Sequence, residues 1–555
     1  MSLPLLAIIF LLLLTIGYFR YGGWVARQFA LNDKKRTPAH AKYDGIDFVP
    51  TRPFYLFGQH FSAIAAAGPI AGPILACQLF GWLPSLLWIA LGVVLIGAVH
   101  DFATLTASVR HEARSIAGIT ASRISRRAGT AMMAFIWIAL IYIIVAFADI
   151  TASSFVSAIE EIQGVKISFN PGGAVAAASI LYLSLALIMG AVQRFLNPPL
   201  WLLTLVFVPL AFGVSWFGTH LSEHFLMTQK TWAILIVAYC AIGSVVPVWL
   251  LLQPRGFLGG FILYFAIAVG MVGIFFGGYE ILQPAFKGFN VGGTTGALFP
   301  FLFVTIACGA CSGFHGLVCS GTTSKQVAKE THTRPVGYGG MLAEAFVAFI
   351  ALSTVMTMSP PQITGLKPGT IYGNGIGQFL SLIIGKENLP FAITLGAMAF
   401  STFVFDTLDV STRLGRYIIQ ELTGWKGMLG ATLGTAITIF PPAVILYLTP
   451  EGSWTSFWAL FGASNQLLAS LSLLTITLWL YQARKRIAFT LLPMLFVLTI
   501  TLWALGSLAV TNYRSAAGLG LSGFNVLAAV ALILLALYIN ICALVKIRLF
   551  KRNVR

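Results

Sequence analysis

The stretch Gly68-Pro69-Ile70-Ala71-Gly72-Pro73 lies inside an otherwise apolar segment and constrains this chain more than any other feature. Lipid offers no hydrogen-bonding partners, so a spanning helix must satisfy its own backbone groups. Glycine and proline in this density remove several of those bonds, which is tolerable only where the freed groups face protein, a ligand or a water-filled cavity. Discontinuous helices of this kind are typical of substrate and ion sites in secondary transporters. A simple proline kink or a helical hairpin is the alternative.

The composition indicates an integral membrane protein. Of the 555 residues, 58% are apolar and only 9% are charged, against about a quarter charged in an average soluble domain. The mean hydropathy is +0.88, and no polar stretch is long enough to fold a core of its own. A net charge of +17 would suggest nucleic acid as the partner of a soluble protein. Here the basic residues cluster in short loops, so we expect the lipid bilayer and no nucleic acid.

Apolar runs of spanning length predict an all-α fold with about fifteen transmembrane helices. The runs begin near residues 3, 61, 84, 130, 173, 200, 232, 257, 300, 338, 390, 428, 454, 487 and 522. With these spans the basic loops all fall on one side, including two short turns marked by Arg194 and Arg255. The positive-inside rule then predicts an N-terminus outside and a C-terminus in the cytoplasm. The first run has no cleavage site, so we expect it to be a retained helix.

The direction of the spans predicts an inverted repeat. The segment from about residue 61 runs from inside to outside and the segment from about 300 runs the other way, and each begins a set of five spans. The first member of each set is interrupted by glycine, at 68–73 and at 309–316. Paired defects in oppositely oriented halves are expected of an inverted-repeat transporter. The predicted parts are an N-terminal helix and loop (1–60), a first repeat (61–217), linking helices (218–299), a second repeat (300–480), and C-terminal helices with a basic tail (481–555).

The six cysteines all lie in apolar segments, where we expect small hydrophobic side chains and no disulfide framework. On an unbroken helix Cys308, Cys311, His315 and Cys319 share one face, and these residue types bind zinc. The outer two would be roughly 16 Å apart at 1.5 Å per residue. They could meet on one ion only if the helix breaks sharply. We therefore expect small-residue packing beside a functional histidine, no metal, and no cofactor other than a coupling ion.

Several motifs between about residues 58 and 470 resemble those of the carbon starvation protein A (CstA) family. They are Gly58-Gln59-His60-Phe61-Ser62, Gly97-Ala98-Val99-His100-Asp101-Phe102, Gly313-Phe314-His315 with Ser320-Gly321-Thr322-Thr323, and Phe461-Gly462 with Asn465-Gln466-Leu467. Better-known members are longer, and they usually carry proline where Ser324 stands here. The resemblance implies a bacterial inner-membrane secondary transporter, related to the amino acid–polyamine–cation superfamily. Members take up peptides, or pyruvate with protons, when preferred carbon is scarce.

Ionisable residues inside a membrane cost about 2.5–3.5 kcal/mol each near its centre on insertion scales, so each is a functional candidate. Glu344 has apolar neighbours on both sides and is a candidate proton carrier, unless a buried hydroxyl or amide satisfies its carboxyl. Asp409 could coordinate Na⁺ with neighbouring hydroxyls or relay protons, or it could pair with Arg413 at an interface. The predicted ion-coupling residues are Glu344, Asp149, Asp406, Asp409, Ser411 and Thr412.

A gate and a substrate site complete the predicted machinery. Histidine titrates near neutral pH, so His60, His100 and the adjacent Asp101 suit proton coupling or a cytoplasmic gate. A structural contact of Asp101 with Arg110 or with a histidine is the alternative. Half-helix N-termini attract anions and would suit a substrate carboxylate, and two amides could donate further bonds or only hold helices together. The predicted substrate-binding residues are Gly68, Pro69, Gly72, Pro73, Gly309, Ser312, Gly313, His315, Asn465 and Gln466.

The sequence therefore predicts an inverted-repeat symporter with discontinuous first helices that works by alternating access. Peptide or small-carboxylate uptake is driven by protons, with Na⁺ as the alternative. An embedded hydrolase would need a nucleophile, a base and an orienting group, or a metal site. Only the adjacent pair His100-Asp101 fits part of that requirement. A nutrient sensor would need an output module, and no soluble domain is visible. The choice between peptide and pyruvate, the coupling ion and the oligomeric state stay open.

Overall fold

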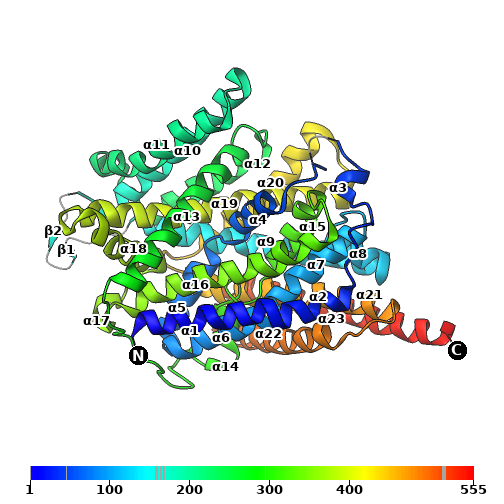
Figure 1. Cartoon of the computed structure of the whole chain (residues 1–555). Coiled ribbons are helices and arrows are strands. Elements are labelled where there is room, and N and C mark those ends of the chain that lie inside the picture. The colour runs from blue at the N-terminus through cyan, green and yellow to red at the C-terminus, as the bar shows by residue number, and fades with distance from the viewer. Residues whose placement is uncertain are drawn as a thin grey trace. The chain divides into compact units, whose positions relative to one another are not determined.

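The computed structural model is built almost wholly of helices (Figure 1) and describes residues 2–44, 47–156, 161–162, 165–166, 169–293, 295–515 and 521–554. From the N-terminus to residue 297 the α-helices are α1 (Leu3–Ile16), α2 (Gly23–Phe29), α3 (Pro38–Ala41), α4 (Pro53–Ile64), α5 (Gly68–Phe80), α6 (Trp82–Gly92), α7 (Ala98–Arg110), α8 (Ile116–Arg123), α9 (Arg126–Ser154), α10 (Pro171–Leu196), α11 (Leu200–His220), α12 (Gln229–Val245) and α13 (Leu252–Phe276).

The remaining helices are α14 (Leu298–Thr305), α15 (Gly313–Gly321), α16 (Gly339–Met356), α17 (Pro360–Ile363), α18 (Pro368–Ile384), α19 (Leu389–Thr423), α20 (Gly427–Leu448), α21 (Trp454–Gln482), α22 (Ala488–Ser515) and α23 (Leu521–Val554). Within the described residues the strands are β1 (Glu161–Ile162) and β2 (Val165–Lys166), which pair antiparallel. An all-α membrane fold is what long apolar segments must adopt, because only helices and closed barrels satisfy the backbone in lipid.

Among the described residues, 12 helices are long and apolar enough to cross a membrane, or 13 if one bent pair counts as a span. The protein is therefore a multi-pass membrane protein. Twelve of the predicted starts fall in or next to these 12 spans. The other three coincide with the bent pair α4–α5, with α12 of 17 residues, and with the short helices α14 and α15. The total of about fifteen spans stays a prediction.

The chain forms two compact units, and each draws on both halves of the sequence. Unit 1 contains Met1–Ala7, Leu140–Pro284 and Ile350–Phe457. Unit 2 contains Ile8–Ala139, Ala285–Phe349 and Trp458–Arg555. In unit 1, α18 and α19 approach closely, since a Cβ on Gly373 would lie 2.9 Å from the Cβ of Ala397. Such small-residue contacts are typical of membrane helices. The predicted division into two repeats stays a prediction.

Unit 2 contains both of the predicted discontinuous helices. The helices α4 and α5 meet at a 47° bend, and the break lies at Ala65–Ala67. The break was predicted at 68–73, but those residues form the first turns of α5. Pro69 lies in the first turn of α5, where a missing N–H removes no intrahelical hydrogen bond, and the helix continues past Pro73 in its interior. In the second segment, α14 ends at Thr305 and α15 begins at Gly313, so residues 306–312 are unwound.

The two breaks pack against each other within unit 2. Gly72 of α5 lies against the end of α14, where an added Cβ would come 2.7 Å from the carbonyl oxygen of Thr305. Gly68 lies against Cys308 in the unwound segment. Only glycine permits backbones to approach this closely. Gly68 and Gly72 therefore allow α5 to pack closely against the second break.

The loops that follow α2 and α15 are also joined in unit 2. The carboxylate of Glu330 accepts two hydrogen bonds from Arg110, of 3.0 and 2.9 Å, and one of 2.9 Å from the backbone N–H of Asn32. Asp33 accepts bonds of 2.9 and 2.8 Å from the backbone and hydroxyl of Thr331. Partial burial acts to raise the pKa of Asp33, but these bonds and nearby cationic groups outweigh it, so the pKa lies below its usual value.

Candidate functional site

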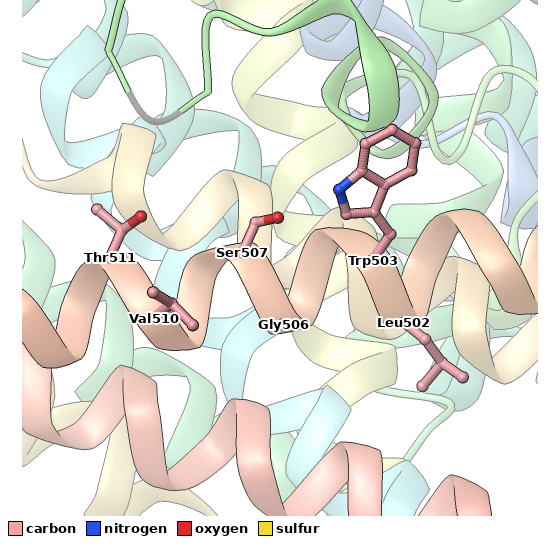
Figure 2. A pocket seen from close by; sticks show the side chains of 6 residues that line it. All are labelled: Leu502, Trp503, Gly506, Ser507, Val510 and Thr511. Carbon is pink, nitrogen blue, oxygen red and sulfur yellow. The ribbon is translucent and has the colours of Figure 1, made fainter.

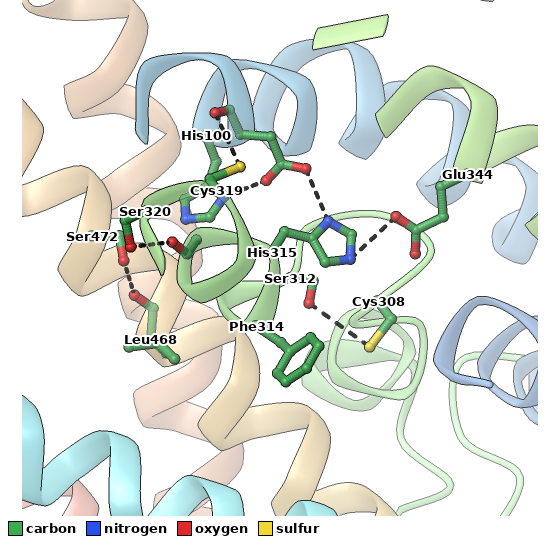
Figure 3. Close-up of polar contacts among 12 residues, drawn as sticks. His100, Cys308, Ser312, Phe314, His315, Cys319, Ser320, Glu344, Leu468 and Ser472 are labelled. Carbon is green, nitrogen blue, oxygen red and sulfur yellow. Dashed lines mark hydrogen bonds and ion pairs between the residues drawn. The ribbon is translucent and has the colours of Figure 1, made fainter. Parts of the chain in front are cut away.

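Four ionisable side chains from three helices form a buried chain in unit 2, which we call the histidine–acid chain: His100, Asp101, His315 and Glu344. On α7, His100 Nδ1 lies 2.7 Å from Oδ1 of Asp101. The other carboxylate oxygen lies 2.9 Å from Nδ1 of His315 on α15. The second ring nitrogen, Nε2, lies 3.2 Å from Oε2 of Glu344 on α16. Figure 3 shows the imidazole of His315 pointing toward Glu344.

All four side chains are within 1% of full burial. Two local features bring them together. His315 is the third residue of α15, so the unwound segment directly before it sets the direction of the helix that carries it. Gly316 follows, and a Cβ there would lie 3.2 Å from Cε1 of His100. A larger residue at 316 would therefore press on the ring of His100, which would have to shift by a few tenths of an ångström.

His60 lies beside this chain. Its Nδ1 is 3.0 Å from the hydroxyl of Thr323 and its Nε2 is 4.0 Å from the sulfur of Cys319. The same sulfur lies 3.5 Å from the backbone oxygen of Asp101. The structure thus brings the three predicted gate residues together with the predicted proton carrier Glu344. Their roles as gate and carrier stay predictions.

Three atoms of the chain have no hydrogen-bond partner in the described structure: Nε2 of His100 and both carboxylate oxygens of Glu344. Oε2 of Glu344 is within ion-pair distance of His315, at 3.2 Å. Native proteins seldom bury polar atoms without partners, and such atoms often mark a chemical role. The open atoms in this chain can accept or release protons, or bind a polar group of a substrate.

Two predicted substrate residues on α21 hold the unwound segment in this structure. Asn465 accepts a hydrogen bond of 2.8 Å from the backbone N–H of Phe314 and donates one of 3.1 Å to Ser312. Gln466 donates a bond of 2.9 Å to the backbone oxygen of Phe303. These hydrogen bonds between helices agree with the alternative prediction, in which the two amides hold helices together. Their role in substrate binding stays a prediction.

Two tryptophans satisfy the other carbonyls released at the end of α14. The indole N–H of Trp88 lies 3.3 Å from the oxygens of both Phe303 and Ile306. The indole N–H of Trp458 donates a bond of 3.1 Å to Thr305. A helix end leaves its last carbonyls without intrahelical partners. Side chains of α6 and α21 supply those partners here.

The cysteines next to this break do not gather around an ion. All six cysteines are free thiols. Among the described residues no group of three or more His, Cys, Asp or Glu side chains is arranged to hold a metal. The sulfur of Cys308 instead lies 3.3 Å from the amide nitrogen of Asn465.

Unit 1 contains a second buried charged group, the arginine cluster: Arg255, Asp406, Asp409 and Tyr239. The sequence predicts that Arg255 marks a short turn, which is wrong, because Arg255 lies in the first turn of α13 and is 1% exposed. Its Nε and Nη2 donate bonds of 2.9 and 2.6 Å to Oδ1 of Asp406 on α19. Its Nη1 donates to Asp409 and, at 2.6 Å, to the hydroxyl of Tyr239 on α12. That hydroxyl donates a 2.8 Å bond to Asp409.

The role of Ser411 and Thr412 in binding Na⁺ together with Asp409 stays a prediction. Thr412 donates a bond of 2.8 Å to the backbone oxygen of Leu408. The hydroxyl of Ser411 has no partner in the described structure. Arg413, the predicted partner of Asp409, donates from Nη2 to two backbone carbonyls at the end of α12, each at 2.7 Å. The guanidinium that binds Asp409 directly is Arg255.

Asp149 forms a third polar group, also in unit 1. Its Oδ1 accepts a bond of 2.7 Å from Gln229, and its Oδ2 has no partner in the described structure. The amide oxygen of Gln229 lies 3.3 Å from Nζ of Lys367. Burial lowers the pKa of Lys367, although Asp149 and Glu451 nearby act to raise it.

The family model described as carbon starvation protein CstA matches residues 2–375 and 364–504. The chain belongs to the CstA family. A peptide transporter CstA from Campylobacter jejuni is 35% identical over 87% of this chain and 77% of its own length. The peptide transporter CstA of Bacillus subtilis is 32% identical over 96% of this chain and 95% of its own. The pyruvate/proton symporter BtsT of Escherichia coli is 30% identical over 88% of this chain and 79% of its own.

Among solved structures, a mutant manganese transporter from Eremococcus coleocola overlays with a TM-score of 0.44 at 14% identity. That overlay covers 89% of this CstA-family chain and 95% of the other chain. A similarity this low carries no information on what the present protein transports.

Sequence reasoning missed two residues of this CstA-family protein, Arg255 and Tyr239. A signal for Arg255 was present, because it is the only basic residue between Lys230 and Lys287 and borders an apolar run. An arginine so placed has few possible partners among the scarce acidic residues of a membrane chain. Nothing in the sequence distinguished Tyr239 from the other tyrosines.

A groove of about 490 Å³ lies on one face of α22 (Figure 2). It is lined by Leu502, Trp503, Gly506, Ser507, Val510 and Thr511. None of these side chains is charged at neutral pH, and Trp503 is exposed on the helix surface. The groove therefore offers no group for ion coupling, and the histidine–acid chain is the better candidate site.

Proposed function

We propose that this CstA-family protein is a secondary active transporter of the bacterial inner membrane, which imports peptides or small carboxylates such as pyruvate together with protons when preferred carbon is scarce. Family membership and the many apolar helices support transport. The names of the relatives support peptides and pyruvate as substrates. We place the N-terminus outside and the C-terminus in the cytoplasm, as the basic loops suggest. No cofactor is needed beyond the coupling ion.

The observation that carries proton coupling is the position of His315 between two carboxylates, at 2.9 and 3.2 Å. A neutral imidazole donates from one nitrogen only. Both ring nitrogens of His315 face carboxyl oxygens, so in the neutral ring only one of the two contacts contains a hydrogen. The second contact becomes a hydrogen bond when one more proton binds, either to the ring or to a carboxyl group. When His315 carries that proton and Asp101 and Glu344 are both ionised, these three groups together have a charge of −1, and a further proton on Glu344 neutralises it. Binding one proton thus removes a buried charge, which favours movement across the membrane.

The substrate carboxylate is proposed to bind at the unwound segment 306–312 and the N-terminus of α15. Helix N-termini attract anions. In this structure the side-chain oxygen of Asn465 accepts the bond from the N–H of Phe314, so a substrate carboxylate would displace that oxygen. His315 lies one residue beyond that N–H. Substrate binding and protonation would therefore act on adjacent residues, as symport requires.

The function is tested by uptake of radiolabelled pyruvate and of a labelled dipeptide into proteoliposomes. An inward proton gradient and an inward Na⁺ gradient are imposed in turn, with wild type, Glu344→Gln and a control, Glu223→Gln. Glu223 is an exposed carboxylate outside the predicted coupling residues. We expect proton-driven accumulation of one substrate by wild type and the control, and none by Glu344→Gln.

Two results would contradict the proposal. Uptake of neither substrate, by protein shown to be folded, would favour the sensor interpretation. Accumulation by Glu344→Gln at the wild-type level would remove Glu344 from coupling while leaving the substrate assignment in place.

A further inference from the structure

The arginine cluster of unit 1 contains the oxygen atoms that a small metal cation would need. Asp406 and Asp409 are one turn apart on α19 and face the same side. The side chain of Asp409 is fully buried and that of Asp406 is 22% exposed. The hydroxyl of Tyr239 lies 2.8 Å from Asp409. Two carboxylates beside a hydroxyl are ligands for hard cations, and transporters use such sites for coupling ions.

The guanidinium of Arg255 occupies the space between these groups. It donates from Nε and Nη2 to Asp406 and from Nη1 to Asp409 and Tyr239. The oxygens that face the centre of the cluster are therefore bound to a positive charge that is part of the chain. Arginine keeps that charge under all ordinary conditions and its planar fork fits carboxylates well.

The second oxygen of each carboxylate lies against helix backbone. A Cβ on Gly243 of α12 would come 2.9 Å from Oδ1 of Asp409, and a Cβ on Gly259 of α13 would come 2.9 Å from Oδ2 of Asp406. These oxygens point toward two different helices. Oδ1 of Asp409 has no hydrogen-bond partner in the described structure, whereas the oxygens of both carboxylates that face each other are bound to Arg255.

We propose that Arg255 is a built-in cation that takes the place of Na⁺ between Asp406 and Asp409, and that it determines the ion specificity of the transporter. Unit 1 carries its compensating charge through the whole transport cycle and has no need of a metal cation. Without Arg255, two carboxylates would be left close together in a buried site. Like charges so placed require a proton or a cation. A neutral residue at 255 therefore opens a site for Na⁺.

Other charged groups near Asp409 do not replace Arg255. Arg413, one turn further along α19, donates from Nη2 to two backbone carbonyls at the end of α12. Arg416 donates a bond of 2.6 Å to the backbone oxygen of Ser244. From α10, Tyr182 donates a bond of 2.9 Å to the backbone oxygen of Arg255 and adds no charge. Arg255 is the cation in direct contact with both carboxylates in the described structure.

The test measures thermal unfolding of the purified full-length protein in NaCl, KCl and choline chloride at equal ionic strength. The variants are Arg255→Gln, Arg255→Lys and the double variant Arg255→Gln with Asp409→Asn. We expect the melting temperature of wild type and Arg255→Lys to be the same in all three salts. We expect Arg255→Gln to melt several degrees lower in choline chloride and to recover in NaCl. The double variant, with one carboxylate fewer, should lose that recovery.

Three outcomes would overturn the proposal. The melting temperature of Arg255→Gln could be the same in all three salts, or Arg255→Gln could fail to fold even in NaCl. The melting temperature of the wild-type protein could also depend on Na⁺. The inference goes beyond the proposed function, and this measurement needs no substrate. A failure of pyruvate and peptide uptake would therefore leave it untouched. Conversely, proton-driven uptake combined with a salt-independent Arg255→Gln would reject this inference alone.

Discussion

At the scale of single residues, the two acids of the histidine–acid chain differ, because Asp101 contacts two histidines and Glu344 contacts one. One oxygen of Asp101 contacts His100 and the other contacts His315, at 2.7 and 2.9 Å. Glu344 contacts one histidine only, and its Oε1 has no partner in the described structure. A carboxylate held by two donors keeps its charge more readily than one held by a single contact. Asp101 is thus suited to fix the ring of His315, and Glu344 to exchange the proton.

This difference predicts unequal effects of two histidine substitutions. His315→Gln removes the ring that joins the two carboxylates, and we expect proton-driven accumulation to fall to the level of protein-free liposomes. His100→Gln removes one of the two donors on Asp101 and leaves the contact to Glu344, so accumulation should be reduced but measurable. Initial uptake rates under an imposed proton gradient provide the comparison. Equal loss in both variants would show that the contact to Glu344 is not the one that matters.

At the scale of elements, the second broken helix is held open by its neighbours. Side chains of α6 and α21 bind the backbone groups that α14 and α15 leave free. A buried donor left without a partner costs about 1–3 kcal/mol. We therefore expect Asn465→Ala to lower the free energy of unfolding by about 1–3 kcal/mol, because the N–H of Phe314 loses its acceptor.

The matched control is Asn540→Ala on α23, whose amide donates a bond of 2.8 Å to a carbonyl of its own helix. Its substitution should change stability by much less. Denaturation of both variants in the same detergent gives the comparison. If the two variants lose the same stability, the packing of α21 and not the bond to Phe314 is what supports the break.

At the scale of the whole molecule, the proposed proton count predicts how uptake responds to membrane voltage. One proton carried with the pyruvate anion moves no net charge, whereas one proton carried with a zwitterionic dipeptide moves one positive charge. A potassium diffusion potential, negative inside, should therefore leave pyruvate uptake unchanged and accelerate dipeptide uptake. The measurement uses valinomycin at constant pH on both sides. Voltage-driven pyruvate uptake would mean that more than one proton crosses with each substrate.

Particular residues show how far the sequence predicted the molecule. The all-helical membrane fold and the family followed from apolar runs and motifs, because lipid leaves the backbone few choices. The break before Gly68 was placed a few residues too late, because Pro69 falls in the first turn of α5 and the helix continues past Pro73. His315 and Glu344 were identified by residue type. Their contact was not, because it joins residues of different helices and depends on three-dimensional packing.

The partners of the charged residues in unit 1 could not be predicted from the sequence. Arg255 was assigned to a loop because short basic turns usually mark the cytoplasmic side. The alternative, an arginine buried against two aspartates of a distant helix, depends on the positions of α12, α13 and α19, which no local pattern reports. The pairing of buried charges is thus the part of this site that only the structure provides.

The tryptophan and amide side chains around residues 306–312 have a consequence for the empty carrier. Because the protein itself binds several of the released carbonyls and one N–H group, we expect the segment to stay unwound in the empty carrier. A carrier that has delivered its substrate can then return without rewinding and melting a helix in each turnover. The speed of that return depends on how fast packed helices slide or tilt past one another, and not on a helix–coil transition.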